Sequence, residues 1–413
     1  MQRDLLNKWR RAISERLLPW FIENRRAFPW RQRRTPYRVW ISELMLQQTR
    51  TEQVVPYFLR FMKSFPTLKA LAQAPRQDVL KAWEGLGYYA RARNIHETAR
   101  RLLALHRGRF PREVDGLRAL PGIGPYTAAA IASLAFGVDA AVVDGNVIRV
   151  LSRLMAFGQD TRLGSARRQF QAWADCLLVK GQSALFNEAM MELGAIVCTP
   201  RKPRCGVCPL QSVCMAFAGG DPEAFPRRPK KARVPHKVVG AGVVVDTRGR
   251  VLIAQRKDDS MLGGLWEFPG GSREEGETLP QCIVRELEEE LGIRTEPGPH
   301  LTTVHHAYSH FTIELHAYWM RIHQGRPRAI HCAAFTWVKL SELRKYPFSK
   351  ADLTIIEALE ARGEVHRFPS SDDYEEDLAR YTVCVGKANS MPSALNRVSS
   401  SRFKRSQKAM KSQ

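Results

Sequence analysis

Four cysteines in one short stretch are the residues whose types and spacing most clearly imply chemistry. Their spacing is C-x6-C-x2-C-x5-C, and the residues are Cys198, Cys205, Cys208 and Cys214. The other cysteines stand apart and are treated as structural or incidental: Cys176, Cys282, Cys332 and Cys384. Four thiolates on one loop can hold a tetrahedral zinc ion or a [4Fe–4S] cluster, because both take four Cys ligands. The spacing alone leaves both alternatives open.

A carboxylate on a largely apolar helix face is a second candidate for chemistry. Thr35 and Pro36 have the residue types of an N-cap and a first helical position, so we expect a helix that carries Glu43. At helical spacing, this face also holds Val39, Trp40, Leu46 and Gln47. Such a carboxylate must be paired or must have a raised pKa, which suits a general acid. The alternative is a buried Glu in a structural salt bridge.

A Gly-Ile-Gly hairpin and a downstream Asp lie between expected helices. A hairpin that opens a helix exposes backbone N–H groups to a phosphate, so Gly122 and Gly124 are candidates for a sequence-independent grip on the DNA backbone. Asp144 ends an apolar run just before another expected helix. It is an N-cap by default. If its other side opens into a cleft, the carboxylate could also stabilise a developing cation.

A third motif, in the second half of the chain, runs from Gly271 to Ile293. It reads G-x5-E-x7-R-E-L-x-E-E-x-G-I and fills every defined position of the Nudix box. The box is a Gly-rich loop followed by a helix, with Glu286, Glu289 and Glu290 on one face. Such a face suits Mg²⁺ bridging a diphosphate. For the carboxylates alone, the alternative is a solvated acidic helix face.

Two domains are expected to position these residues. Apolar residues recur at helical spacing in residues 1–217, which predicts an all-α domain that ends in the cysteine loop 198–214. Residues 238–368 change to strand-like alternation, with helical stretches at about 278–291 and 351–362. They predict a second domain of the α+β class. The fold class is therefore multidomain.

The remaining segments have the composition of connections. Residues 218–237 are rich in Pro, Gly and basic side chains, which predicts a linker. Residues 369–413 predict a disordered basic tail, because residues 382–413 hold seven basic and no acidic side chains. A chain of 413 residues is also longer than one ordinary domain.

The net charge of +23 is concentrated in the helical part of the chain. Residues 1–220 hold 34 Lys and Arg against 16 Asp and Glu, whereas residues 221–413 hold 30 against 25. This asymmetry favours a nucleic-acid partner over a merely soluble basic protein. No apolar run approaches the ~20 residues of a membrane span, and the N-terminus lacks the core of a signal peptide. We therefore expect a cytosolic protein with no membrane partner.

The order of these motifs resembles a known superfamily. The helix–hairpin–helix, the downstream Asp and the cysteine spacing resemble the endonuclease III superfamily of DNA glycosylases. Within it, WISELMLQQTRT, EGLGYYARARN, VDGNVIRV and NEAMMELGAIVC resemble the adenine DNA glycosylase family known as MutY. The resemblance covers residues 1–217 almost completely. It implies that the four cysteines hold a [4Fe–4S] cluster rather than zinc.

The resemblance also implies a reaction, in which a flipped adenine is protonated and an oxocarbenium-like sugar is stabilised by two carboxylates. Glu43 matches the family's acid and Asp144 its cation stabiliser. Tyr126, Asn146 and Glu188 match residues that surround the leaving base and the sugar in the family. Trp30 and Arg31 resemble part of its adenine pocket. Four further residues match those that the family inserts into the base stack around the opposing damaged base: Gln48, Thr49, Leu86 and Tyr88. Bifunctional relatives carry a Lys where this chain has Tyr126, so excision without efficient strand nicking is implied.

The family carries a C-terminal MutT-like domain that recognises 8-oxoguanine opposite adenine. Tyr308, Ser309 and His310 resemble its recognition loop, although a polar β-hairpin turn is the alternative. We predict a monomeric, bacterial, nucleoid-associated repair enzyme that removes adenine opposite 8-oxoguanine and, less strongly, guanine. One alternative is an endonuclease III-like pyrimidine glycosylase and lyase, against which Tyr126 argues. The other is an inactive glycosylase scaffold fused to an active Nudix pyrophosphatase, against which the intact pair Glu43 and Asp144 argues.

Overall fold

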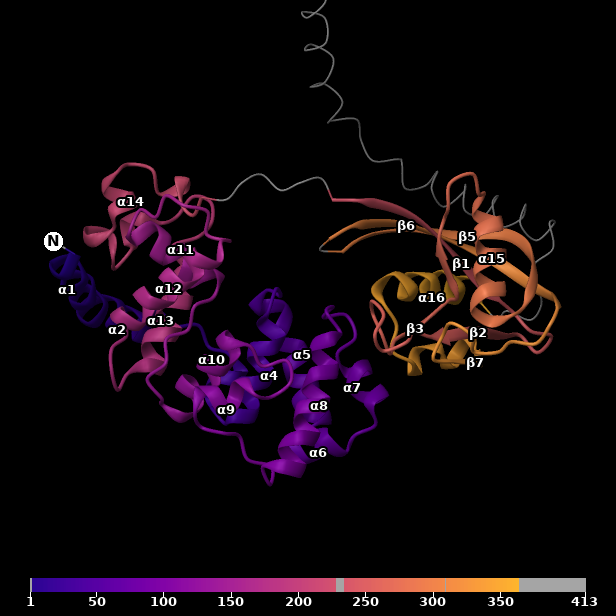
Figure 1. Cartoon of the computed structure of the whole chain (residues 1–413), viewed down its shortest axis with the longest axis horizontal. Helices are drawn as coiled ribbons and strands as arrows, with labels where there is room; N and C mark the ends of the chain where they lie inside the picture. The colour runs from indigo at the N-terminus through magenta and orange to yellow at the C-terminus, as the bar shows by residue number, and fades with distance from the viewer. Residues whose placement is uncertain (1, 228–233, 309, 364–413) are drawn as a thin grey trace, which may run out of the picture.

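The structure, a computed structural model, describes residues 2–227, 234–308 and 310–363. It contains a helical domain followed by a domain with two β-sheets, as the sequence pattern predicts (Figure 1). Three features named above lie outside the described residues: Ser309, Cys384 and the expected tail 369–413.

The helical domain has two lobes, each with its own hydrophobic core. The first core is built around large, fully buried aromatic side chains such as Trp40, Phe58 and Trp83. The helices of this lobe are α3 (Pro29–Gln32), α4 (Pro36–Leu46), α5 (Thr51–Ser64), α6 (Leu68–Gln73), α7 (Arg76–Ala82), α8 (Ala90–Leu105), α9 (Val114–Arg118) and α10 (Pro125–Phe136).

The second lobe combines the start of the chain with the helices that follow α10. Trp9, Ile13 and Leu17 recur every four residues and are buried in its core, and a π-helical turn, η1 (Ile13–Leu17), interrupts the helix there. Its other elements are α1 (Gln2–Ala12), α2 (Leu18–Asn24), α11 (Gly145–Leu154), α12 (Gly164–Leu177), α13 (Ser183–Ile196), α14 (Met215–Ala218) and the 3-10 turns η2 (Cys205–Val207), η3 (Gln211–Val213) and η4 (Pro222–Ala224). Because the chain visits this lobe twice, residues far apart in sequence meet where the lobes face each other.

The second domain consists of two β-sheets and two α-helices, and the apolar side chains that alternate along the strands form its cores. The four-stranded sheet has the order β4-β1-β6-β5, with β1 and β6 parallel, and the three-stranded sheet has the order β3-β2-β7. The strands are β1 (His236–Val244), β2 (Arg250–Gln255), β3 (Trp266–Glu267), β4 (Gly270–Ser272), β5 (Arg294–Ala307), β6 (Thr312–Gln324) and β7 (Ala334–Lys339). The helices are α15 (Leu279–Leu291), α16 (Lys350–Arg362) and the 3-10 helix η5 (Leu340–Lys345), and α15 and α16 contribute to separate cores.

The loop between β2 and β3 reaches into the helical domain. Leu265 from this loop is fully buried and belongs to the core of the first lobe. Nearby, the guanidinium of Arg76 on α7 forms a two-pronged ion pair with Asp258, with N–O distances of 2.6 and 2.7 Å. The strand domain is therefore docked on the first lobe at α7.

Part of the segment that the composition marks as a linker is folded onto the second lobe. Arg153 Nε on α11 donates to the carbonyl oxygens of Pro222 and Phe225 at 2.9 and 3.0 Å. Strand β1 begins at His236, two residues before the expected start. Residues 218–227 thus extend the helical domain.

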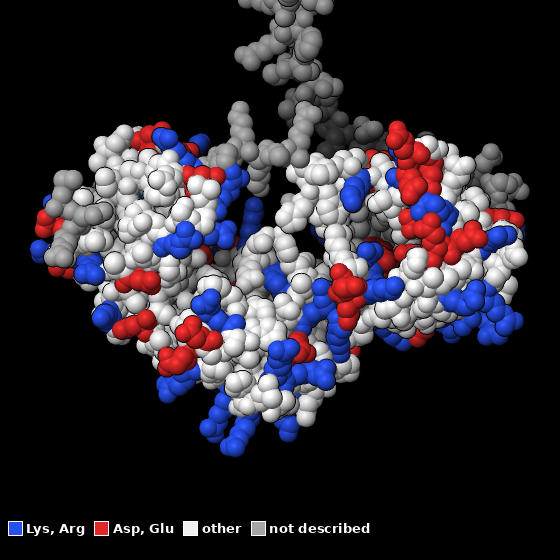
Figure 2. Space-filling model, in the orientation of Figure 1, with Lys and Arg blue, Asp and Glu red and all other residues white. Residues whose placement is uncertain are grey.

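Basic side chains gather along the hollow between the two domains in Figure 2, whereas acidic side chains cluster on the strand domain over α15. The excess of basic residues in the helical part of the sequence is therefore found partly along this hollow. In the part of the chain that the structure describes, no helix is both long enough and apolar enough to cross a lipid bilayer.

Candidate active site

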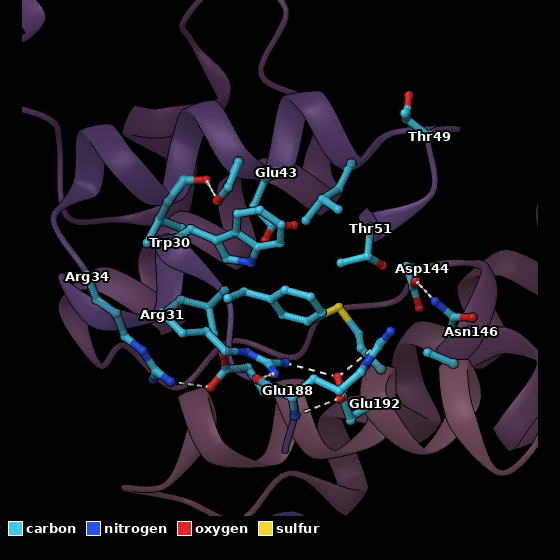
Figure 3. A pocket seen from close by; sticks show the side chains of 18 of the residues that line it. Trp30, Arg31, Arg34, Glu43, Thr49, Thr51, Asp144, Asn146, Glu188 and Glu192 are labelled. Carbon is cyan, nitrogen blue, oxygen red and sulfur yellow. Dashed lines mark hydrogen bonds and ion pairs between the residues drawn. The ribbon is translucent and has the colours of Figure 1, made fainter. Parts of the chain in front are cut away.

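A pocket of about 170 Å³ lies where the two lobes of the helical domain face each other (Figure 3). The first lobe contributes Glu43 from α4, and the second contributes Asp144 and Glu188 from α11 and α13. Five further residues singled out in the sequence also line it: Trp30, Arg31, Thr49, Tyr126 and Asn146. The fold therefore brings together residues that come from opposite ends of the helical domain.

Glu43 sits on the buried face of α4, which begins as the sequence predicts. Thr35 caps the helix by accepting from the Arg38 N–H, and Pro36 takes the first helical position. The hydroxyl of Tyr126 donates a hydrogen bond to Glu43 Oε2 at 2.5 Å. Burial, with smaller effects of the Asp144 and Glu188 charges, raises the pKa of Glu43 to about 7, although the Tyr126 hydrogen bond opposes the shift. Its partner is thus a hydroxyl rather than a cation, and a large share of Glu43 is protonated at neutral pH.

Asp144 caps α11 and faces the same pocket. Its Oδ1 accepts from the Val147 N–H at 2.7 Å, and its Oδ2 accepts from the Asn146 amide at 2.8 Å. Burial raises the pKa of Asp144, whereas these hydrogen bonds to its charged form lower it. Asn146 is itself held by the guanidinium of Arg149 at 2.7 Å. These contacts fix the carboxylate in one orientation and favour its ionised form.

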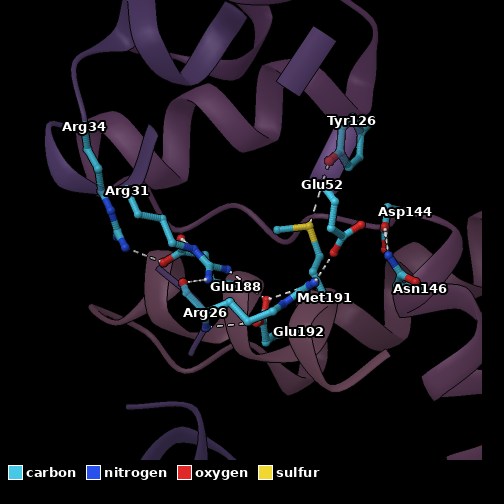
Figure 4. Close-up of polar contacts among 10 residues, drawn as sticks. All are labelled: Arg26, Arg31, Arg34, Glu52, Tyr126, Asp144, Asn146, Glu188, Met191 and Glu192. Carbon is cyan, nitrogen blue, oxygen red and sulfur yellow. Dashed lines mark hydrogen bonds and ion pairs between the residues drawn. The ribbon is translucent and has the colours of Figure 1, made fainter. Parts of the chain in front are cut away.

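A network of arginines and glutamates closes one side of the pocket (Figure 4). Glu188 accepts from Arg31 at 3.0 Å and from Arg34 at 2.6 Å. Glu192, one turn further along α13, accepts from Arg26 at 2.8 Å and from Arg31 at 3.1 Å. Arg31 therefore bridges two buried carboxylates, and these ion pairs hold its side chain at the pocket wall.

Three residues that line the pocket were not predicted from the sequence: Arg26, Arg34 and Glu192. A local signal for Glu192 existed, because it follows Glu188 by four residues on the same helix and so shares its face. The arginine-rich run around Trp30 supplies the partners. Which arginine meets which glutamate depends on how the two lobes pack, and no pattern in the sequence encodes it.

The expected helix–hairpin–helix is formed by α9, the turn that follows it and α10. Gly122 has a φ of +70°, and a Cβ added there would lie 2.5 Å from Asn94 Cβ, so the turn needs glycine. Gly124 is the N-cap of α10 and supplies no side-chain cap, while Pro125 takes the first helical position. The backbone N–H groups at this helix end are suited to a phosphate oxygen.

Of the residues matched to the damaged base, Leu86 and Tyr88 line a second pocket, whereas Thr49 lines the first. Gln48 and Tyr88 both have left-handed backbone conformations, with φ of 60° and 49°, and the Tyr88 hydroxyl donates to Gln48 Oε1. Tyr88 is 39 % exposed, whereas Leu86 is only 5 % exposed and packs in the first lobe. Of the two, Tyr88 is the side chain presented at the surface.

That second pocket, of about 450 Å³, lies between the two domains. The helical domain contributes Leu86 and Tyr88, and the strand domain contributes Tyr308 and His310 from the turn between β5 and β6. Residue 350, the first of α16, also lines it. The turn is therefore a β-hairpin connection, and it faces the helical domain.

The cysteine loop begins at the end of α13 and packs against the second lobe. Arg153, which is 2 % exposed, donates to Cys198 Sγ at 3.3 Å and to the Thr199 carbonyl at 2.7 Å. Burial, and then the charges of the other three thiolates, raises the pKa of Cys208 to about 12. Four thiolates on one short loop need a positive partner, and the guanidinium of Arg153 adds positive charge beside Cys198. The donor set therefore fits a thiolate-ligated iron–sulfur cluster.

The Nudix box forms the loop and helix expected for it. Arg285 on α15 donates to Glu277 at 2.6 Å, to Glu286 at 3.0 Å and to Glu289 at 3.4 Å. Glu290 Oε2 is buried and has no hydrogen-bond partner among the described residues. Burial, followed by the charge of Glu286, raises the pKa of Glu290 to about 7. The box thus contains one buried carboxylate oxygen that a cation would satisfy.

Comparison with known families assigns each part of this architecture. Residues 41–175 match the HhH-GPD superfamily of base excision DNA repair proteins, and residues 198–214 match the iron-sulfur binding domain of endonuclease III. Residues 240–358 match the NUDIX domain. The fold and site therefore define a helix–hairpin–helix DNA glycosylase with an iron–sulfur loop and a Nudix domain.

The relatives narrow this class. The chain is 34 % identical to the adenine DNA glycosylase of Rattus norvegicus over 394 residues, which cover 82 % of this chain and 76 % of the relative. It is 33 % identical to the human adenine DNA glycosylase, covering 82 % and 72 %. For the enzyme of Buchnera aphidicola subsp. Acyrthosiphon pisum the identity is 31 %, covering 75 % and 87 %. The chain belongs to the adenine DNA glycosylase family.

It is accordingly a base excision repair hydrolase of N-glycosyl bonds that acts on DNA and carries an iron–sulfur cluster. The predicted family, fold class, enzyme class and DNA partner are confirmed. The individual roles of the site residues stay proposals.

Proposed function

We propose that this enzyme excises adenine mispaired with 8-oxoguanine and, less efficiently, adenine mispaired with guanine. The observation that supports it most is the pairing of two pockets in one chain. One holds Glu43 and Asp144, and the other is shared between the helical domain and the β5–β6 turn. A duplex that lies across the basic hollow could present adenine to the first and its partner base to the second.

The chemistry proposed for the first pocket uses side chains and one water molecule: the N-glycosyl bond breaks, adenine leaves with a proton, and the water oxygen bonds to the sugar carbon and releases a proton. Protonated Glu43 donates its proton to the leaving adenine, and Tyr126 holds the carboxyl group in place through its hydrogen bond at 2.5 Å. Asp144, fixed by Val147 and Asn146, stabilises the positive charge that develops on the sugar. The adenine ring packs against Trp30, and Glu188 and Arg31 face its polar edge.

The reaction is proposed to stop at the abasic site. Schiff-base formation with the sugar needs an amine, and the pocket position next to Glu43 carries the phenol of Tyr126. The decisive experiment is single-turnover excision on duplexes with adenine opposite 8-oxoguanine, adenine opposite guanine, or thymine glycol. We expect rates in the order 8-oxoguanine above guanine, no reaction on thymine glycol, and strand breaks only after alkali. Fast release of thymine glycol, or nicking without alkali, would overturn the proposal.

His310 is proposed to read the damaged base, together with Tyr308 and Ser309. His310→Ala removes a hydrogen-bonding side chain from the pocket between the domains, so the preference for 8-oxoguanine over guanine should fall by about tenfold. Excision opposite guanine should be unchanged, because Glu43 lies in the other domain. The matched control is His331→Ala, an exposed histidine of the same domain. Equal discrimination in wild type and His310→Ala would show that the lesion is read elsewhere.

We propose that the cluster is of the [4Fe–4S] type and that its ligands are Cys198, Cys205, Cys208 and Cys214. The purified protein should then absorb near 400 nm and contain about four irons per chain. Cys208→Ser should lower the iron content, whereas Cys176→Ser, at an exposed cysteine outside the loop, should not. Full iron content in Cys208→Ser would contradict this ligand set.

We also propose that Glu286, Glu289 and Glu290 can hold Mg²⁺, with the unpartnered Glu290 Oε2 as one ligand. Paramagnetic Mn²⁺ serves as a probe, and Glu290→Gln should weaken its binding by at least about tenfold. Glu288→Gln on the same helix, an exposed residue paired with Arg294, is the control. Adenine excision should proceed in EDTA, since Glu43 and Asp144 need no metal. Equal Mn²⁺ binding in Glu290→Gln and wild type would remove this site.

A monomer is the proposed active state, because one chain supplies both pockets. Bacterial cytoplasm, with the protein on the nucleoid, is the proposed location, since the substrate is genomic DNA.

A further inference from the structure

The loop between α7 and α8, residues 83–89, is held from two sides. It carries Leu86 and Tyr88, the helical-domain residues of the pocket between the domains. Gly85 has a φ of +91°, and a Cβ there would lie 2.3 Å from the Tyr57 hydroxyl, so this position of the loop favours glycine. Trp83 Nε1 closes the loop internally by donating to the Gly87 carbonyl at 3.1 Å.

The strand domain holds the loop through the backbone of Phe348. The Phe348 N–H donates to Glu84 Oε1 at 2.9 Å, and the Tyr89 hydroxyl donates to the Phe348 carbonyl at 3.1 Å. Lys81 adds a bond to the Tyr346 carbonyl at 3.0 Å and pairs with Glu84 at 2.6 Å. The residue after Phe348 is the N-cap of α16 and lines the pocket between the domains. One short segment of the strand domain therefore touches both the pocket and the loop.

Within the first lobe, the loop is held by Arg91 of α8, which is 8 % exposed. Its Nη2 donates to the carbonyls of Leu86 and Gly87 at 3.1 and 3.0 Å. Its Nη1 donates to the carbonyls of Leu44 and Gln47 at 2.6 and 2.7 Å, at the C-terminal end of the helix that carries Glu43. A single buried guanidinium thus ties the loop to α4.

We propose that Glu84 and Tyr89 are positioning residues, through which the Phe348 segment of the strand domain places Tyr88 and Gln48 against the lesion strand. This inference rests on the proposed function, in which the β5–β6 turn recognises the damaged base. It adds a route, through the loop and Arg91, by which that reading reaches α4, the helix that carries Glu43. Neither residue touches the reacting atoms, so their effect appears in discrimination between mispairs rather than in the chemical step.

The test uses the full chain with three substitutions. Tyr89→Phe removes only the hydroxyl, and Glu84→Ala removes the acceptor of the Phe348 N–H. Each should reduce the preference for 8-oxoguanine over guanine by about fivefold and leave excision opposite guanine unchanged. Tyr89→Phe also removes the acceptor of the Gly85 N–H, and Glu84→Ala also removes the partner of Lys81, so agreement between the two variants identifies the contact with Phe348 that they share. Glu84→Gln separates the two contacts of Glu84, because its amide oxygen can still accept from the Phe348 N–H whereas the ion pair with Lys81 is lost. It should keep the wild-type preference for 8-oxoguanine.

A second readout follows the position of the loop directly. 2-Aminopurine placed next to 8-oxoguanine brightens when the stack is opened, and Tyr89→Phe should reduce that brightening at saturating protein. A uniform rate loss on both duplexes with a lower melting temperature would overturn the inference, because it would indicate a merely structural role. Unchanged brightening and discrimination in Tyr89→Phe would also overturn it. If His310→Ala has no effect while Tyr89→Phe dims the probe, lesion reading by the turn fails and the positioning of the loop stands.

Discussion

Replacing Glu43 with Gln should slow adenine excision by at least about 10³-fold while leaving mismatch binding intact. The amide has nearly the shape of the carboxyl group and can still accept from Tyr126, but it cannot give a proton to the base. The interaction lost exists only in the transition state, so affinity for the duplex should persist. The measurement is single-turnover excision at saturating enzyme, with the dissociation constant of the uncleaved duplex determined beside it.

The pH profile supplies the control for this result. Burial raises the pKa of Glu43 to about 7, so the acid form predominates below that pH and is depleted above it. Wild-type excision should therefore decline as pH rises through about 7, and the residual rate of Glu43→Gln should lack this decline. A variant that excises adenine at a near wild-type rate, or that keeps the wild-type profile, would exclude Glu43 as the acid.

Asp144→Asn should also slow adenine excision by about 10³-fold, here because a negative charge is lost rather than a proton donor. The carboxylate supplies negative charge to a cation that forms on the sugar, and Asn removes that charge. Its side-chain oxygen can still accept from the Val147 N–H, now at 2.7 Å from Oδ1, so α11 keeps its cap. A collapsed rate with a small fall in melting temperature is the expected combination, because the new amide group faces the Asn146 amide that donated to Oδ2.

Asp139→Asn is the matched control for this change. Asp139 precedes the same helix and accepts from the Gly181 N–H at 2.9 Å, but it does not line the pocket. It should leave excision unchanged. Excision by Asp144→Asn within about tenfold of wild type would indicate that the sugar cation is stabilised by other groups.

The parts of the molecule that sequence patterns predict are those that depend on neighbours along the chain. Thr35 and Pro36 mark the start of α4, Asp144 the start of α11, and the cysteine spacing a ligand loop, because each is a local signal. The switch from helical to alternating periodicity likewise predicts the two domains. For these features, backbone chemistry within a few residues decides the outcome.

Features that depend on packing between distant segments are not predictable in this way. Arg26 meets Glu192 across 166 residues, and Arg34 meets Glu188 across 154, so only the closed fold defines these pairs. The same holds for Leu86, which matches a wedge residue by motif but is buried in the first lobe. A motif specifies the residue type, whereas exposure depends on the surrounding chain.

Leu265 shows that the strand domain shares part of its packing with the helical domain. A side chain from the loop between β2 and β3 completes the core of the lobe that carries Glu43. This loop also lines the pocket between the domains through Met261 and Leu262, so substitutions there are constrained by the packing of the lobe that carries Glu43. Neither domain can therefore be replaced by that of a relative unless the contact at Leu265 is preserved.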